Sequence, residues 1–279
     1  MTTLPTRDRS VDAEVLPSDR SGRWAGIRWA VPSIVTVAVL VAVWQIYVVT
    51  SGVRPQVLPS PVRVVEQGWA HRDEIATHAA ATLQVTLIGF AVSLSAAWVL
   101  AVIVDFSPWL RRALVPLFVA SQTVPIVAIA PLMIIWFGFG LLPKILVVAL
   151  VTFFPMAIGL IEGFAAADRD AGALLRSMGA SRVQEFGYVR LPSALPRFFT
   201  SLRIAITYAV VGAVFAEYVG ASVGLGIYMS LQKNSFRTDL VLAAVLVTAL
   251  LSIALYLTTF AVERLVAPWA RTENRSRRD

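Results

Sequence analysis

The chain has 279 residues, of which 57% are hydrophobic and only 15% are charged. Soluble domains usually carry about a quarter charged residues, so this composition excludes an ordinary soluble domain and indicates that lipid surrounds much of the chain. The net charge of +7 would favour a nucleic-acid ligand in a soluble protein, but here the positions of the charges indicate a membrane topology instead.

Residues 1–28 are polar and charged without a helical apolar period, which predicts a disordered cytoplasmic tail. Six apolar stretches follow, each long enough to cross roughly 30 Å of hydrocarbon as a helix. They are residues 29–50, 82–104, 113–137, 144–164, 199–219 and 240–262. A basic cytoplasmic tail, residues 266–279, ends the chain. The sequence therefore predicts an all-α membrane protein with one six-span domain over residues 29–265.

The third stretch, residues 113–137, contains Pro116, Pro125 and Pro131. Each proline removes a backbone donor and clashes with the preceding helical turn. Broken helices are tolerated at membrane depth where they are buried or line a cavity. We therefore expect this span to be bent or broken.

Eighteen of the 24 Lys and Arg residues fall in segments that share the cytoplasmic side if the N-terminus is cytoplasmic. Because basic residues are retained on that side, both termini are predicted to be cytoplasmic in a multi-pass cell-membrane protein. This topology, with attraction to anionic membrane lipid, explains the pI near 10.3 without nucleic acid.

Small residues recur at four-residue spacing in two spans, where they would let helix backbones approach closely. The fifth span has two such stripes, which would suit contacts with its own bundle and with a second subunit. A plain abundance of Gly and Ala in membrane helices is the alternative. The residues are Gly89, Ser93, Ala97 and Ala101 in the second span, and Ala205, Ala209 and Ala213 beside Gly212, Ala216 and Gly220 in the fifth.

The segment between the fourth and fifth spans, residues 168–196, is patterned as two short helices. Asp168 can cap the first, Gly179 can end it in a left-handed conformation, and Ser181 with Gln184 has capping-box spacing for the second. Leu191-Pro192 is expected to end that second helix, because the residue before proline avoids the helical region.

The spacing of Gly179, nine residues, Val189, one residue and Leu191-Pro192 resembles the cytoplasmic EAA loop of binding-protein-dependent ABC importer permeases. In that family a short helix of the loop sits in a cleft on the ATPase subunit. Residues 124–145 are similar to the nitrate, sulfonate and taurine branch, which includes carriers of thiamine precursors and riboflavin. The resemblance covers about residues 29–265 and implies the type I importer permease fold. The residues that it assigns to ATPase coupling are Arg176, Ser177, Met178, Gly179, Ala180, Ser181, Leu191 and Pro192.

The segment departs from the family at its start, because the Glu-Ala-Ala triplet would fall on residues 173–175, which are Ala-Leu-Leu. The missing glutamate leaves Asp170, Arg176 and Glu185 as candidates to contact the ATPase in its place.

The resemblance implies alternating access in a dimer of permeases, with a homodimer expected. The expected partners are ABC ATPase subunits, an extracytoplasmic binding protein, a second permease copy and membrane lipid, with no nucleic acid. The sequence lacks a Walker A motif, so ATP and Mg are expected on the ATPase and no catalytic residue or cofactor on this chain. No metal site is expected, since cysteine is absent and the two histidines, His71 and His78, suit a surface role.

The solute implied is small, with residues 137–144 favouring a heterocyclic thiamine precursor or riboflavin, and sulfonate, taurine or nitrate as the alternative. Polar residues at membrane depth are candidates to line its path, although for each of them an interhelical hydrogen bond is the favoured explanation. They are Gln45, Gln122 and Thr123 beside Pro125, Thr207 and Glu217. Snorkelling to water at a span end would also explain Glu217 and Asp105.

Two other classes of membrane protein compete with this interpretation. An ion-gradient secondary transporter often shows inverted repeats, and none is evident. An intramembrane enzyme would need a nucleophile or metal cluster within the spans, where no Ser/His or His/Glu pair occurs.

Overall fold

The computed structural model describes residues 22–267, with side chains from residue 31 onward. Every regular element in this range is helical. The predicted terminal tails lie outside the described residues, except for residues 22–28, which begin the first helix, and residues 266–267. The chain divides into two compact units, residues 1–52 and 53–279, and each is described by itself.

The first unit contains one helix, α1 (Gly22–Ser51). Its segment Val31–Ser51 is long and apolar enough to cross a membrane, and none of the most apolar stretch is buried. The hydroxyls of Thr36 and Thr50 donate to the carbonyls of Pro32 and Ile46 one turn earlier, so these polar groups are satisfied within the helix. A helix that is apolar all round suits lipid, in agreement with the predicted first span.

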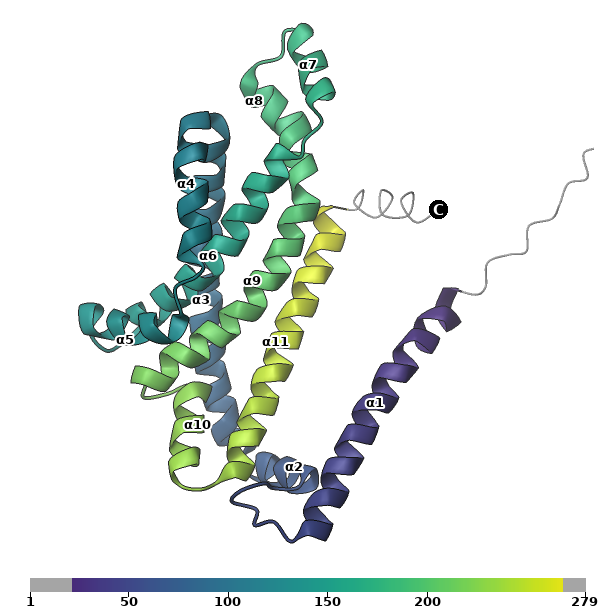
Figure 1. Ribbon diagram of the computed structural model, residues 1–279, viewed down its shortest axis with the longest axis vertical. Helices are drawn as coiled ribbons and strands as arrows, with labels where there is room; N and C mark the ends of the chain where they lie inside the picture. Colours follow the sequence, from purple (N-terminus) through teal and green to yellow (C-terminus); the bar gives the residue numbers. More distant parts are fainter. Residues whose placement is uncertain (1–21, 268–279) are drawn as a thin grey trace, which may run out of the picture. The chain divides into compact units, whose positions relative to one another are not determined.

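Residues 53–267 form a bundle in which α3, α6 and α9 pack together and α11 lies against α9 (Figure 1). Five described helices, α1 included, are long and apolar enough to span, and α4 with α5 makes a sixth if the pair counts as one span. The six-span prediction is therefore confirmed. The elements are α2 (Pro61–Ala70), α3 (Arg72–Phe106), α4 (Pro108–Ser121), α5 (Ile126–Phe137), α6 (Leu141–Ala165), α9 (Leu191–Gly220), α10 (Leu225–Asn234) and α11 (Thr238–Val266).

Small residues hold the central helices close together. A Cβ atom added to Gly89 of α3 would lie 2.6 Å from the Cβ of Val148 on α6, and one on Gly163 of α6 would lie 2.9 Å from the Cα of Ala194 on α9. Either distance is too short for a side chain. Close approach of backbones therefore joins α3, α6 and α9, as the small-residue spacing predicts.

Both small-residue stripes of α9 face helices of this chain. One stripe lies in the main core cluster, while Ala216 of the other packs against Ala130 of α5 and Val147 of α6. Gly212 also faces Val148, since an added Cβ would lie 3.6 Å from its Cα. The expectation that one stripe serves a second subunit is therefore wrong for these residues, because α5 and α6 already cover it.

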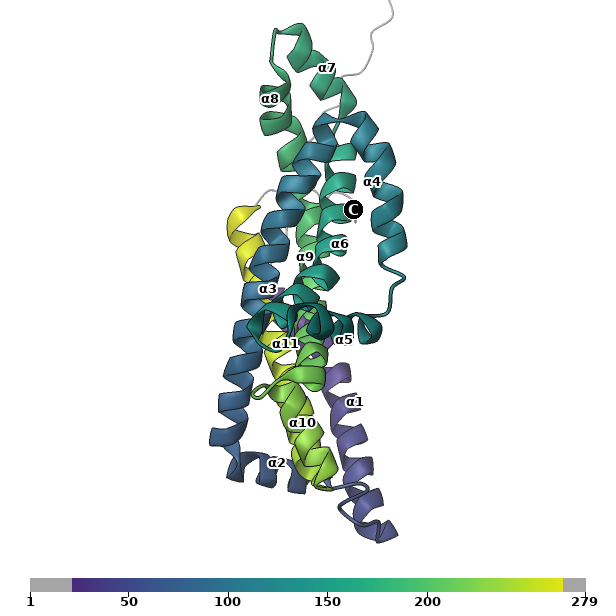
Figure 2. The ribbon, with the colours of Figure 1, turned by 90° about the vertical axis from the view of Figure 1, so that its left-hand side faces the viewer.

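The third predicted span is broken, as expected. Helices α4 and α5 meet at an angle of 101°, and Figure 2 shows α5 turning away from the line of α4. Of the three prolines only Pro125 lies at the break, in extended conformation directly before α5. Pro116 and Pro131 lie inside α4 and α5, whose helices continue through them. The break therefore coincides with only one of the three prolines.

Candidate functional site

The segment between α6 and α9 projects beyond one end of the bundle as two short helices, α7 (Arg169–Ser177) and α8 (Arg182–Glu185) (Figure 1). The Asp168 side chain accepts hydrogen bonds from two amides of the first turn of α7. Gly179 adopts a φ of +86°, which favours glycine, and Ser181 forms a reciprocal capping box with Gln184. The predicted pair of capped helices around a glycine bend is confirmed.

The expectation that Leu191-Pro192 ends the second helix is wrong. A π-helical turn, Phe186–Arg190, follows α8 and leads directly into α9, which begins at Leu191. Pro192 is the second residue of α9, directly after the π turn, so the helix continues through a residue that has no N–H to donate. The wider π turn lets the Leu191 amide donate to the Phe186 carbonyl, so the loop is rigidly continuous with a spanning helix.

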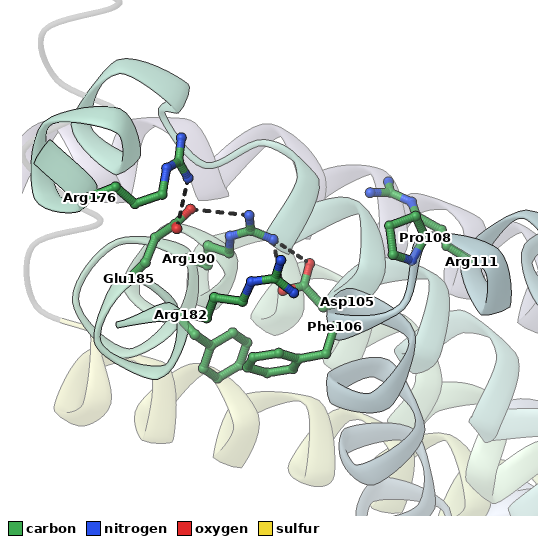
Figure 3. Close-up of a pocket in the computed structure, with 9 residues that line it drawn as sticks. Asp105, Phe106, Pro108, Arg111, Arg176, Arg182, Glu185 and Arg190 are labelled. Carbon is green, nitrogen blue, oxygen red and sulfur yellow. Dashed lines mark hydrogen bonds and ion pairs between the residues drawn. The ribbon is translucent and has the colours of Figure 1, made fainter. Parts of the chain in front are cut away.

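Four charged side chains fasten this loop to the end of α3, and we call them the ion-pair brace: Asp105, Arg176, Glu185 and Arg190 (Figure 3). Glu185 accepts from Arg176 at 2.8 Å and from Arg190 at 3.2 Å. Arg190 also donates to both oxygens of Asp105, at 3.1 and 3.0 Å. Charge-assisted bonds of this kind are stronger than neutral ones. A movement of the loop would therefore be transmitted to α3 as well as to α9.

Glu185 is the centre of the brace. The residue is only 6% exposed, and its carboxylate packs against Gly172 of α7, where an added Cβ would lie 3.0 Å from Oε1. Of the three candidates to replace the missing family glutamate, Glu185 and Arg176 are thus engaged with each other inside the loop. Asp170 is exposed, and its side chain makes no ion pair within the described part of the chain.

Four large apolar side chains of the loop are exposed among polar and charged ones. Met178 and Tyr188 are each 75% exposed, although both belong to a segment held by ion pairs and caps. Exposed large apolar side chains gathered on one small element indicate an interaction surface. Of these, only Met178 is among the coupling residues that the family resemblance assigns. The four exposed apolar residues are Leu174, Met178, Val183 and Tyr188.

The predicted coupling residues divide into two groups. Arg176 to Ser181 lie at the projecting end, where the Ser177 hydroxyl donates to the Leu174 carbonyl and the Ala180 amide donates to the Leu175 carbonyl. Leu191 and Pro192 are half-buried in the first turn of α9, and Leu191 packs against the core. The structure therefore places the last two at the base of the loop.

The predicted path residues do not gather in one place. Gln122, Thr123 and Pro125 are exposed at the break between α4 and α5. Thr207 is exposed on α9, and its hydroxyl donates to the Arg203 carbonyl. Gln45 belongs to the first unit, whose position relative to the second is not defined. The two cavities at the loop end of the bundle contain none of these side chains in their linings.

Glu217 differs from the other path candidates because it is fully buried. Its Oε2 accepts from the Thr82 hydroxyl of α3 at 2.9 Å and from the Gly226 amide of α10 at 3.0 Å. Snorkelling is therefore wrong for this residue: the carboxyl points into the protein. No cation lies within ion-pair distance of it among the described residues, and its Oε1 has no hydrogen-bond partner there.

The segment before α10 closes tightly over Glu217. Gly224 has a φ of +141°, and an added Cβ would lie 2.2 Å from the Cδ of Glu217. The Leu225 amide donates to the Thr82 hydroxyl oxygen at 2.8 Å. His78 Nδ1 lies 2.9 Å from the Gly224 carbonyl oxygen and 3.0 Å from its amide nitrogen. We call this set, His78, Thr82, Glu217, Gly224 and Gly226, the glutamate clasp.

Tyr228 extends the clasp on α10. Its ring centroid lies 5.0 Å from that of His78, and its hydroxyl is buried without a hydrogen-bond partner in the described part of the chain. Burial raises the pKa of Tyr228 to about 12, so the phenol remains neutral at physiological pH. The role of His78 was missed from the sequence, since a surface position explained it adequately.

A family model described as the binding-protein-dependent transport system inner membrane component matches residues 89–272. The chain belongs to this permease family. Its members are ABC permeases, and the match agrees with the importer permease and the branch expected from residues 124–145. The permease is 34% identical to the formylaminopyrimidine transport permease ThiX of Halalkalibacterium halodurans, over 84% of this chain and 94% of that protein.

The permease is also 37% identical to the riboflavin transport permease RibX of Chloroflexus aurantiacus, covering 84% of this chain and 88% of that protein. It is 32% identical to the taurine permease TauC of Escherichia coli, over 88% of this chain and 92% of that protein. Among solved structures, the inward-facing MetNI methionine ABC transporter aligns with a TM-score of 0.57 at 18% identity, covering 66% of this chain and 92% of that one. This likeness confirms the fold.

Proposed function

We propose that the chain forms the translocation path of an ATP-driven importer and docks on ATPase subunits through residues 168–196. The observation that carries the proposal is the loop itself, which is capped at both helices and braced to α3 while four of its large apolar side chains stay exposed. A rigid element with an exposed apolar face suits a groove on a partner, where buried apolar contacts supply the affinity. The brace then passes movement of the partner into the spanning helices.

In this proposal the loop and both chain termini are cytoplasmic, as the Lys and Arg distribution favours. ATP and Mg are bound by the ATPase, a binding protein delivers the solute from the other side, and a second copy of this permease completes the path. Gln122, Thr123 and Pro125 support a path between copies, because they are exposed at the α4–α5 break, where a second chain could cover them.

For the solute we propose a small heterocycle, of the thiamine-precursor or riboflavin class. Identities of 37% and 34% to the riboflavin and formylaminopyrimidine permeases exceed the 27% and 29% to two nitrate permeases. An aliphatic-sulfonate permease at 34% and a taurine permease at 32% make sulfonates the alternative. Uptake of labelled riboflavin, formylaminopyrimidine, taurine and nitrate by cells that express the whole importer separates these solutes.

The test of the coupling role is Gly179→Asp. We expect the ATPase no longer to co-purify and uptake to fall at least roughly tenfold, a ratio within the range of typical coupling effects between sites. The reason is that a side chain at Gly179 strains the bend that positions the loop. Gly52→Asp is the matched control, since Gly52 also has a positive φ, +65°, and neither glycine has an atom within 4 Å of an added Cβ. Normal uptake by Gly179→Asp would refute the role.

The same assay addresses an ion-gradient transporter, the competing class. Uptake driven by a solute binding protein and abolished when ATP is depleted supports the importer. Uptake that survives ATP depletion and stops with a protonophore would support the secondary transporter instead.

A further inference from the structure

A cavity of about 480 Å³ lies between the projecting loop and the turn from α3 to α4. Its charged lining consists of Asp105, Arg111, Arg176, Arg182, Glu185 and Arg190, with Phe106 and Phe186 on its apolar side (Figure 3). The volume is in the range of small-ligand sites. The cavity thus combines guanidinium groups with an aromatic wall at the end of a spanning helix.

The charges of this cavity do not balance. Both carboxylates are engaged in the ion-pair brace, Asp105 with Arg190 and Glu185 with Arg190 and Arg176. Arg111 and Arg182 make no ion pair or hydrogen bond with a side-chain acceptor within residues 31–267. Since arginine stays charged in proteins, four cations and two anions leave an excess of two positive charges.

The N-terminus of α4 adds positive potential to the same place. Helix starts favour acidic residues, because their free amides carry partial positive charge. The first turn of α4 has no acidic residue, and it contributes Pro108 and Arg111 to the cavity wall. The N-cap Ser107 hydroxyl accepts only from the Leu110 amide, so the start of this 14-residue helix and the unpaired Arg111 on it add positive potential to the same wall of the cavity.

We propose that this cavity binds a phosphate group, with Arg111 and Arg182 as its principal ligands. Guanidinium groups match phosphate oxygens in charge and geometry. Basic pockets beside membrane helices suit lipid headgroups, and Phe106 and Phe186 offer an apolar wall to an acyl chain. An anionic phospholipid and free phosphate share this chemistry. Because the brace lines the cavity, a bound phosphate also lies against the residues that fasten the loop.

The lipid source rests on the proposed cytoplasmic position of the loop at the membrane boundary, but the binding test does not depend on transport. The purified permease in neutral detergent is titrated with short-chain phosphatidylglycerol, short-chain phosphatidylcholine and inorganic phosphate at constant ionic strength. Thermal unfolding midpoint and lipid retention in native mass spectrometry are measured. If only phosphatidylglycerol raises the unfolding midpoint saturably, the ligand is a lipid headgroup. If inorganic phosphate raises it in the same way, the ligand is the free ion.

The double variant Arg111→Gln with Arg182→Gln is expected to weaken binding at least roughly tenfold, since both charged donors to the phosphate are replaced by neutral amides. Arg112→Gln is the matched control, because Arg112 is adjacent, exposed and outside the cavity. The double variant Arg111→Lys with Arg182→Lys keeps both charges and should retain partial binding. Its binding would show that substitution at these two positions does not by itself disrupt the fold.

Equal binding by the wild-type permease and the double Gln variant would overturn the proposal, as would the absence of saturable binding in the wild type. Unchanged phosphate and lipid binding together with loss of ATPase co-purification in the double variant would also overturn it, and would assign the two arginines to an acidic partner surface. If the wild-type permease binds phosphate but the Gly179→Asp variant takes up solute normally, the phosphate site stands and the proposed coupling function is refuted.

Discussion

Two short segments that do not span the membrane are fastened to opposite ends of α3 and α9, and they are held by different chemistry. The loop of α7 and α8 is held by the ion-pair brace, in which two arginines and two carboxylates alternate. The segment before α10 is held by the glutamate clasp, where one carboxyl takes hydrogen bonds from a hydroxyl and an amide with no cation in contact. Each uses a glutamate that is under 10% exposed.

The surroundings explain the difference. Arg176 and Arg190 remain 52% and 35% exposed, so their charges keep contact with water while Glu185 is buried between them. At Glu217 the groups in contact with the carboxyl, Thr82, Gly224 and Gly226, are buried, and bringing a guanidinium there would cost several kcal/mol of desolvation. A charge network would suit a segment that moves with a partner, as proposed for the loop, whereas a dry clasp built on glycine contacts suits a fixed attachment.

Among the substitutions that test this comparison of brace and clasp, Gly224→Ala is expected to have the largest effect on stability. The added Cβ would lie 2.2 Å from Cδ of Glu217, and the alanine would have to adopt a φ of +141°. We therefore expect a loss of about 3 kcal/mol or more in unfolding free energy. Gly140→Ala is the matched control, since Gly140 has a φ of +142° with nothing within 4 Å of an added Cβ. Its cost should be limited to backbone strain, about 1–2 kcal/mol.

Thermal and denaturant unfolding in detergent measure both variants, with hydrogen exchange of residues 221–234 to localise the change. Equal losses in the two variants would show that strain alone matters and that Gly224 is not part of a close-packed clasp.

The sequence was a good guide to the loop because its signals are local. Asp168, Gly179 and the Ser181–Gln184 pair each act on backbone within three residues, so their spacing alone predicts the caps and the bend that the structure contains. The end of α8 was predicted wrongly because Pro192 fits either a helix stop or the first turn of a helix. Only the packing of Leu191 on the core decides between them.

The clasp could not be predicted in the same way, because its contacts join residues far apart in the chain. Thr82 and Glu217 are 135 positions apart, and His78 and Gly224 are 146 apart. From the sequence, Gly224 and Gly226 look like a flexible stretch after a span. In the structure they are glycine because Glu217 and the Val214 carbonyl leave no space for a side chain. The brace was equally hidden, since Asp105 and Arg190 are 85 positions apart.

A smaller effect is expected from Glu185→Gln, which removes charge from the centre of the brace without changing its shape. The amide oxygen can accept from one arginine, but both ion pairs with Glu185 are lost, so we expect a loss of about 1–2 kcal/mol in the local stability of residues 169–190. Hydrogen exchange of this segment measures it, and Asp170→Asn, an exposed carboxylate outside the brace, is the control. The difference from wild type should shrink as salt is raised, because partly exposed ion pairs are screened. A difference that is insensitive to salt would mean that Glu185 acts through packing on Gly172.

The smallest effect is expected from the same substitution in the clasp, Glu217→Gln. The amide oxygen can take the place of Oε2 and accept from Thr82 and Gly226, while the amide nitrogen replaces an oxygen that has no partner among the described residues. Because no ion pair is lost, we expect a change below about 0.5 kcal/mol and no dependence on salt. Glu217→Leu is the companion variant: it keeps most of the volume but orphans the Gly226 amide, which should cost about 1–3 kcal/mol, while the Thr82 hydroxyl can still donate to the His78 carbonyl. A loss above about 1 kcal/mol for Glu217→Gln, measured beside Glu185→Gln in the same detergent, would show that the clasp needs its charge as the brace does, and the contrast between the two ends would fail.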